Sequence, residues 1–97
     1  MKIVVAPQAV TDIEVAMRWW LSNRPKAPEP LQEELRGALA FISETPHAGI
    51  PMASGKPSNV RRVPLPRSRY LLYYRVLTDT VRVLRLWHMS RLAPPLR

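Results

Sequence analysis

Residues 60–88, VRRVPLPRSRYLLYYRVLTDTVRVLRLWH, decide the fold of this chain. Three β-branched and aromatic runs follow one another there, at residues 60–66, 70–77 and 81–88. Such side chains pack well on a pleated surface, and Thr78-Asp79 fits a tight hairpin turn between two of the runs. The stretch therefore predicts three consecutive strands. The two prolines of the first run favour an edge strand or a bulged end.

Alternation along these strands predicts which side chains share a face. It groups Tyr70, Leu72, Tyr74 and Val76 on one face of their strand, and Leu71, Tyr73, Arg75 and Leu77 on the other. On the last strand it separates Arg82, Leu84, Leu86 and His88 from Val81, Val83, Arg85 and Trp87. No face is purely polar, so we expect one face to cover helices. The other face would expose arginines and aromatics, a surface suited to nucleic acid or to a partner's helix or strand.

The first half of the chain predicts one strand and two helices. Residues 2–6 form a short β-branched run that Pro7 ends. A helix follows from Ala9 to Arg24, with its apolar stripe at Val10, Ile13, Met17, Trp20 and Leu21. Pro28 or Pro30 fits the first turn of a second helix that ends at Thr45-Pro46, with its stripe at Leu31, Leu35, Ala38, Leu39 and Ile42. Close approach of the helices would explain Gly37 inside it, and residues 46–58 read as loop. The resulting order, β-α-α-β-β-β, predicts an α+β domain in which two antiparallel helices pack on a mostly antiparallel sheet.

Length and composition exclude several classes of protein. At 97 residues we expect a single domain, residues 1–97. The absence of cysteine excludes disulfide scaffolds and thiolate chemistry, and two histidines make a histidine-built metal site unexpected. The three glycines are too scattered to cradle a phosphate, so no cofactor and no metal are expected. No apolar run is long enough to cross a bilayer and the start lacks a signal peptide's features, so we expect a cytoplasmic protein with no membrane partner.

The positive charge of the chain is concentrated in its second half. The net charge is +8, with twelve arginines among the fifteen basic residues. Residues 56–97 hold ten basic residues against one acidic residue, Asp79, whereas residues 1–55 are near neutral. Such a surface suits nucleic acid, a phosphate-rich site or an acidic protein partner.

Four landmarks in order along the chain resemble the RelE/ParE superfamily, the toxins of bacterial toxin–antitoxin pairs. The first is Pro7-Gln8-Ala9 with an acidic helix start. The others are residues 44–51 (ETPHAGIP), the pair 60–63 (VRRV) and 70–76 (YLLYYRV), and residues 83–88 (VLRLWH) followed by Arg91. The resemblance spans nearly the whole chain. It implies either a RelE-like endoribonuclease that cuts messenger RNA on the ribosome, or a ParE-like inhibitor of DNA gyrase that performs no hydrolysis.

The resemblance favours the ParE-like branch. Metal-free RNA cleavage needs an acid, a base and cations around the phosphate. The RelE-like motif supplies basic residues on the second strand, after the tyrosine that opens the third, and at the end of the fourth. This chain has Arg62, but Pro64 stands two positions on, Leu71 follows Tyr70, and Met89 follows His88. The loss of one such cation costs about 10²–10³ in rate.

The function predicted is therefore that of a type II toxin that binds and poisons DNA gyrase and is neutralised by a cognate acidic antitoxin in a hetero-oligomer. The antitoxin is expected over the helical pair and the sheet edge. The alternative is a ribosome-dependent, metal-independent mRNA endoribonuclease whose catalytic residues are His88, Arg62 and Arg91. A third reading is a binding module without toxicity. His88 is open to a structural, partner-facing or catalytic role. The residues expected to bind target or partner are Arg61, Arg62, Arg75, Arg85, His88, Arg91 and Trp19.

Four further sets of side chains have a plain structural explanation. Trp20 lies on the helix stripe and Trp19 flanks it, so Trp19 is either core or an interface anchor. One of Tyr73 and Tyr74 packs inside. Arg67 and Arg69 at the hairpin turn are expected to be solvated or to touch an acidic partner. Glu29, Glu33 and Glu34 crowd the start of the second helix, where the helix dipole favours them.

Overall fold

Five strands form one sheet in the order β1-β5-β4-β3-β2, with two helices packed against it. The structure is a computed structural model that describes residues 1–24, 29–52 and 59–91. β1 pairs parallel with β5, and the other neighbouring strands pair antiparallel. The elements in chain order are β1 (Lys2–Val5), α1 (Pro7–Asn23), α2 (Glu29–Glu44), the 3₁₀ turn η1 (Pro46–Ala48), β2 (Ile50–Pro51), β3 (Val60–Leu65), β4 (Tyr70–Val76) and β5 (Thr80–His88). The predicted α+β fold is confirmed, with β2 added inside the segment expected to be loop.

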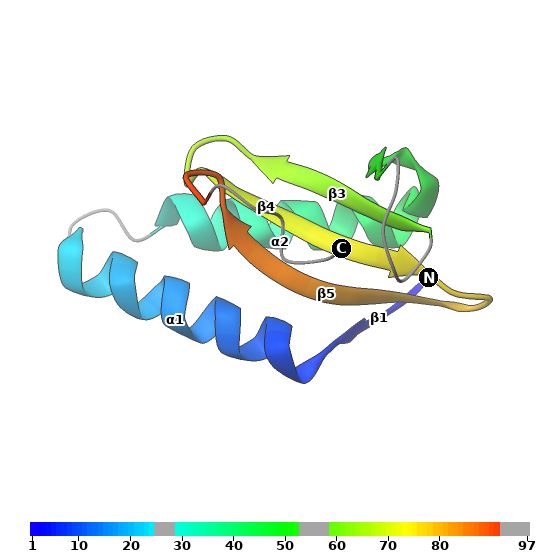
Figure 1. The fold of residues 1–97 in the computed structure, drawn as a ribbon, viewed down its shortest axis with the longest axis horizontal. Coiled ribbons are helices and arrows are strands. Elements are labelled where there is room, and N and C mark those ends of the chain that lie inside the picture. Colours follow the sequence, from blue (N-terminus) through cyan, green and yellow to red (C-terminus); the bar gives the residue numbers. More distant parts are fainter. Residues whose placement is uncertain (25–28, 53–58, 92–97) are drawn as a thin grey trace.

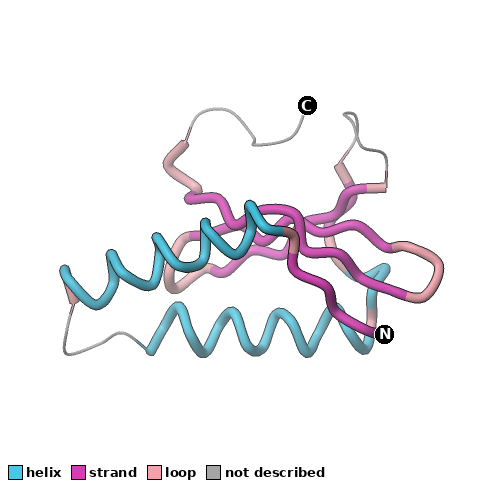
Figure 2. Tube along the Cα trace, turned by 90° about the horizontal axis from the view of Figure 1, so that it is seen from below, coloured by secondary structure: helices cyan, strands magenta, loops and turns pink. Residues whose placement is uncertain are grey.

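Both helices lie on one side of the sheet and run antiparallel (Figure 1). α2 crosses behind the strands in that view, whereas α1 runs beside β1 and β5 at the sheet margin. Figure 2 shows α2 as a layer below the strands and α1 nearer to their level. The core lies between these layers. It is built from Ala9, Ala16, Trp20, Leu31, Leu35, Ala38, Ile42, Leu65, Leu72, Tyr74, Val81, Val83 and Leu86. No described helix covers the opposite face of the sheet.

The second helix packs as predicted, and the first does so only in part. The predicted stripe of α2 faces the core. In α1 the buried residues include Ala9 and Ala16, whereas Val10 and Leu21 are 43% and 60% exposed. The prediction for those two side chains was wrong because α1 lies at the sheet margin, where only a narrow strip of the helix meets the core.

Two details of the helices differ from the expectation, at the start of α1 and at Gly37, and the proline predicted in the first turn of α2 is confirmed. α1 begins at Pro7 and not at Ala9, since proline is favoured at the first helical position. Pro30 lies in the first turn of α2, and Pro28 lies outside the described residues. The close helix contact expected at Gly37 is not found, because a Cβ placed there would meet nothing within 4 Å.

A β-bulge in β5 changes which side chains face the helices. Tyr74 pairs with Val83 but Tyr73 pairs with Arg85, so Leu84 is an extra residue without a partner on β4. Such a bulge shifts the alternation by one position. Val83 and Leu86 therefore both enter the core, and the strict alternation predicted for this strand was wrong beyond the bulge.

The Tyr74 hydroxyl ties the segment after α2 to the sheet. It donates to the Pro46 carbonyl at 2.7 Å and accepts the Gly49 N–H at 2.9 Å. A Cβ on Gly49 would lie 2.3 Å from that hydroxyl oxygen, so only glycine fits. Both Tyr73 and Tyr74 are buried, where the sequence predicted one of them inside. The glycine of the ETPHAGIP landmark is thus explained by a close approach rather than by an unusual backbone angle.

We predict opposite effects for two alanine substitutions at glycines. Gly49→Ala should lower the free energy of unfolding by about 1–3 kcal/mol, because the new methyl group displaces a buried, hydrogen-bonded tyrosine. Gly37→Ala should raise it by about 0.5–1 kcal/mol, since an open helix position gains propensity. Urea unfolding followed by circular dichroism measures both. Equal stability of the two variants would contradict the steric role of Gly49.

Candidate functional site

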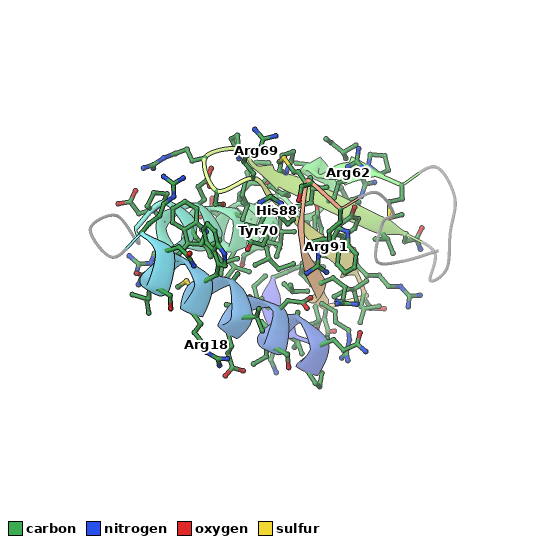
Figure 3. The ribbon with its side chains drawn as sticks, turned by 60° about the vertical axis from the view of Figure 1, so that its left-hand side comes forward. Arg18, Arg62, Arg69, Tyr70, His88 and Arg91 are labelled. Atoms are coloured by element: carbon green, nitrogen blue, oxygen red, sulfur yellow. The ribbon has the colours of Figure 1, made fainter. Side chains whose placement is uncertain are left out.

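A pocket of about 440 Å³ lies where the end of α1 meets the β3–β4 turn and the end of β5. Its walls are aromatic or imidazole rings and its mouth carries arginines. We call it the Arg/Trp pocket, lined by Trp19, Trp20, Arg24, Arg67, Arg69, Tyr70 and His88, with Ser68 at its base. Figure 3 shows Tyr70 and His88 next to each other, Arg69 on the turn above them, and Arg18 pointing away from them on the far side of α1.

Tyr70 and His88 meet because the strand register places them opposite each other. Their rings make an edge-to-face contact with centroids 5.0 Å apart. The Ser90 N–H donates to His88 Nδ1 at 3.1 Å, so in the neutral ring the proton resides on Nε2. Burial raises the pKa of the Tyr70 phenol, and the nearby charge of Arg91 offsets part of that rise. The Tyr70 phenol of this pair is therefore a neutral hydrogen-bonding group at physiological pH.

The turn that carries Arg67 and Arg69 is held by a glutamate from α2. Glu34 accepts the backbone N–H of Arg67 and of Ser68, each at 2.8 Å, and the Ser68 hydroxyl at 2.8 Å. Glu33 makes an exposed ion pair with Arg67 at 3.2 Å. The helix dipole alone was therefore an incomplete explanation for these two glutamates, because they fix the pocket's upper wall.

The face of the sheet opposite the helices carries a second group of cations. Cross-strand pairing and alternation place Arg62 and Arg75 there with Tyr73. Arg75 stands directly opposite Arg82, and its buried Nε finds no hydrogen-bond partner in the described part of the chain. Trp87 lies on this face as well, and the guanidinium of Arg91 stacks over its ring at 4.2 Å.

Asp12 of α1 fastens the helix to β5 immediately after the bulge. Its carboxylate accepts Arg85 Nε at 2.7 Å and Nη2 at 3.1 Å, and it also accepts the Leu86 N–H at 3.0 Å. This bond raises the pKa of Arg85. Asp12 therefore continues the edge pairing of β5 beyond the end of β1, and Arg85 has a structural role.

The predicted site residues fall into three places. Trp19 and His88 line the Arg/Trp pocket, and Trp19 is 48% exposed. Arg62, Arg75 and Arg91 belong to the opposite face of the sheet. Arg61 and Arg85 make contacts within the fold. Arg61 donates to the Gly49 carbonyl at 2.9 Å, and Arg85 donates to Asp12.

The set proposed for catalysis is split by the sheet, because Arg62 and His88 lie on opposite faces. Figure 3 shows Arg62 well to one side of His88. Arg91 follows His88 closely in the chain, and its guanidinium lies over Trp87.

The sequence reading missed the pocket itself and assigned its two turn arginines only to solvent or an acidic partner. The members come from three distant segments, so no local motif contains them. Pairing the last two strands around Thr78-Asp79 without a bulge would have placed Trp87, not His88, opposite Tyr70.

Within residues 1–24, 29–52 and 59–91, no group of three or more acidic, histidine or cysteine side chains is arranged to hold a metal ion. No helix in that part of the chain is long and apolar enough to span a membrane.

Comparison with known proteins identifies the family. The sequence model described as "ParE toxin of type II toxin-antitoxin system, parDE" matches residues 3–93. The chain belongs to this ParE toxin family. A curated relative, "Toxin RelE1" of Caulobacter vibrioides, is 29% identical over 86 residues, which are 89% of this chain and 90% of the relative. The protein is therefore a toxin of the type II toxin–antitoxin class within the RelE/ParE superfamily.

Solved structures share the fold of this ParE-family toxin. The chromosomal ParDE system from P. aeruginosa superimposes with a TM-score of 0.76 at 16% identity, covering 93% of this chain and 97% of that one. A chain of the intact E. coli RelBE toxin–antitoxin complex superimposes with a TM-score of 0.64 at 21% identity, covering 93% of this chain and 98% of that one. A chain of the E. coli DinJ-YafQ toxin–antitoxin complex superimposes with a TM-score of 0.66 at 14% identity, covering 96% of this chain and 97% of that one. The resemblance seen in the sequence landmarks is confirmed.

We predict that the Asp12–Arg85 ion pair contributes more stability than the exposed ion pair between Glu33 and Arg67. Asp12→Ala should lower the free energy of unfolding by about 2–3 kcal/mol, because it leaves a half-buried guanidinium and a strand N–H without their acceptor. Asp12→Asn should cost less, since an amide oxygen still accepts the N–H.

The matched control is Glu33→Gln, which breaks the exposed pair with Arg67. It should cost less than about 1 kcal/mol. Denaturant unfolding at low salt measures all three variants. A loss for Asp12→Ala no larger than that for Glu33→Gln would contradict the role of Asp12 as the edge contact.

Proposed function

We propose that this toxin inhibits DNA gyrase without hydrolysing nucleic acid. The observation that supports this choice is the separation of the residues that RNA cleavage would need. His88 faces the helices and Arg62 faces the other side of the sheet. Leu71 pairs with Trp87 on that other side, where the ribonuclease motif would place a cation. Because His88 and Arg62 cannot contact one phosphate together, the set named for cleavage lacks the convergent charge that dominates phosphoryl chemistry.

We also propose that a cognate acidic antitoxin neutralises the toxin in a hetero-oligomer, in the cytoplasm where gyrase resides. The cations on the sheet, such as Arg62, Arg75 and Arg82, and those of the Arg/Trp pocket give an acidic chain complementary charge on both sides of the molecule. Complementary charge accelerates encounter and excludes wrong partners. The helical pair and the sheet edge formed by β2 and β3 are the surfaces expected to be covered. A crosslinking map that places the antitoxin away from residues 56–97 would contradict this arrangement.

A ribosome-dependent endoribonuclease is the second candidate. The contact between Tyr70 and His88 favours it, because the histidine has a defined tautomer and the charge of Arg91 lies close enough to affect the pKa of Tyr70. Histidine is the usual acid–base residue near neutral pH.

One experiment separates the two candidates. The full-length toxin is induced, and plasmid supercoiling and transcript 5′ ends are measured in the same cells. We expect relaxed or cleaved plasmid DNA with unchanged transcript ends, and rescue by co-expression of the antitoxin. Purified toxin should likewise inhibit supercoiling by purified gyrase. Codon-phased transcript ends together with normal supercoiling would contradict the gyrase proposal, and His88→Ala should then reduce cleavage by about 10²–10⁴.

A further inference from the structure

The Arg/Trp pocket combines flat ring walls with cations at its mouth. We propose that it anchors a segment of the antitoxin in which one bulky apolar side chain is flanked by carboxylates. The apolar side chain would enter between Trp19 and Tyr70, and the carboxylates would meet Arg24 and Arg69. This inference rests on the proposed neutralisation of the toxin by an acidic antitoxin. It adds the place of contact and the chemistry of the contacting segment.

Within the described residues, the lining of the pocket carries positive charge, which Glu33 and Glu34 offset only at the Arg67–Ser68 side. Seven residues and Ser68 line it, and none of them is acidic. The guanidinium of Arg24 lies over the Trp20 ring at 5.6 Å and keeps its charge near the mouth. Arg67 has a partner in Glu33, but both side chains of that pair are more than half exposed. An incoming carboxylate can share such an exposed guanidinium at little cost.

The turn beside the pocket disfavours a phosphate group as the ligand. Consecutive backbone N–H groups are the usual cradle for phosphate, and here Arg67 and Ser68 provide them. Both are already bonded to the carboxylate of Glu34 at 2.8 Å. The donors left to a ligand are arginine side chains spread along the mouth. Several carboxylates on one peptide match that arrangement better than one compact phosphate.

The ring wall supplies the apolar part of the site. Trp19 is 48% exposed and meets the buried Trp20 edge to face, with centroids 5.7 Å apart. An exposed tryptophan braced by a second ring is the kind of residue that dominates interface energies. Val15, one turn earlier on α1, is 53% exposed and extends the apolar surface away from the pocket. A partner chain can therefore continue from the pocket along α1.

The backbone at Arg69 gives an independent sign of a functional position. Its φ is +65°, in the left-handed region that long side chains rarely adopt. The residue is fixed at both ends, since its N–H donates to Leu65 and its carbonyl accepts the Met89 N–H, each at 2.8 Å. Strain that the surroundings impose in this way is concentrated at binding sites, and here it sets an arginine at the pocket mouth.

The experiment measures the affinity of the full-length toxin for the antitoxin encoded beside its gene, by calorimetry or by surface-immobilised binding. The pocket variants are Trp19→Ala and Arg69→Asn. Asparagine tolerates the left-handed backbone, so Arg69→Asn removes the charge without loss of fold. The control is Arg18→Gln, on the far side of α1 (Figure 3). Circular dichroism verifies that each variant is folded.

We expect each pocket variant to weaken binding by about tenfold or more, mainly through faster dissociation, and the Arg18→Gln control by less than about threefold. Wild-type affinity in both pocket variants would overturn the proposal and leave the antitoxin partnership intact. Failure of the wild-type toxin to bind the antitoxin would overturn both the anchoring role of the pocket and the proposed antitoxin partnership. Adenosine monophosphate serves as a competitor. If it displaces the antitoxin from the wild type and fails to bind Arg69→Asn, the pocket is a nucleotide site and the proposal is wrong.

Discussion

One extra residue in β5 determines how this molecule presents its chemistry. Leu84 has no partner on β4, so every side chain after it lies on the face opposite to the one that simple alternation predicts. Leu86 consequently fills the core and His88 joins Tyr70 beside α1. Trp87 lies on the other face, where the guanidinium of Arg91 stacks over its ring. Without the bulge, the indole would stand opposite Tyr70.

Contacts from distant segments hold the surfaces that the bulge creates. A bulge interrupts regular pairing, and here Asp12 accepts the Leu86 N–H two residues beyond it. Glu34 holds the β3–β4 turn from α2, and Tyr74 holds the segment after α2 from the sheet. Each contact places a charged or hydroxyl group of one element against backbone donors that another element leaves open. Buried or half-buried donors are costly when unpaired, so these few contacts fix the relative positions of helices, turn and sheet.

The two faces of the sheet separate two kinds of surface. On the helix side, rings and arginines at the end of α1 form a pocket with the turn and with His88. On the other side, Arg62, Arg75 and Arg82 gather around aromatic side chains with no described helix above them. The arginines described within residues 59–91 are therefore divided between the Arg/Trp pocket and the cationic face opposite the helices. Arg85 and Arg61 are used inside the fold.

Much of the fold followed from the sequence because local preferences agreed with the tertiary structure. The three strand runs, the stripe of α2 and the break at Thr45-Pro46 needed only periodicity and proline chemistry. The stripe of α1 was predicted less well, since Val10 and Leu21 fit the period but lie where the sheet ends. The short strand β2 gave no signal, because two residues, one of them a proline, carry no periodicity.

The sequence by itself determined the α+β order, the family and the concentration of charge in the second half, because these depend on residue type and spacing. The tertiary structure alone decided which cations act together. That outcome depends on a bulge of one residue and on pairings between positions far apart in the chain, such as Asp12 with Arg85 and Tyr70 with His88. A shift of one residue in register reverses the faces of a strand, and no local pattern in β5 encodes that shift.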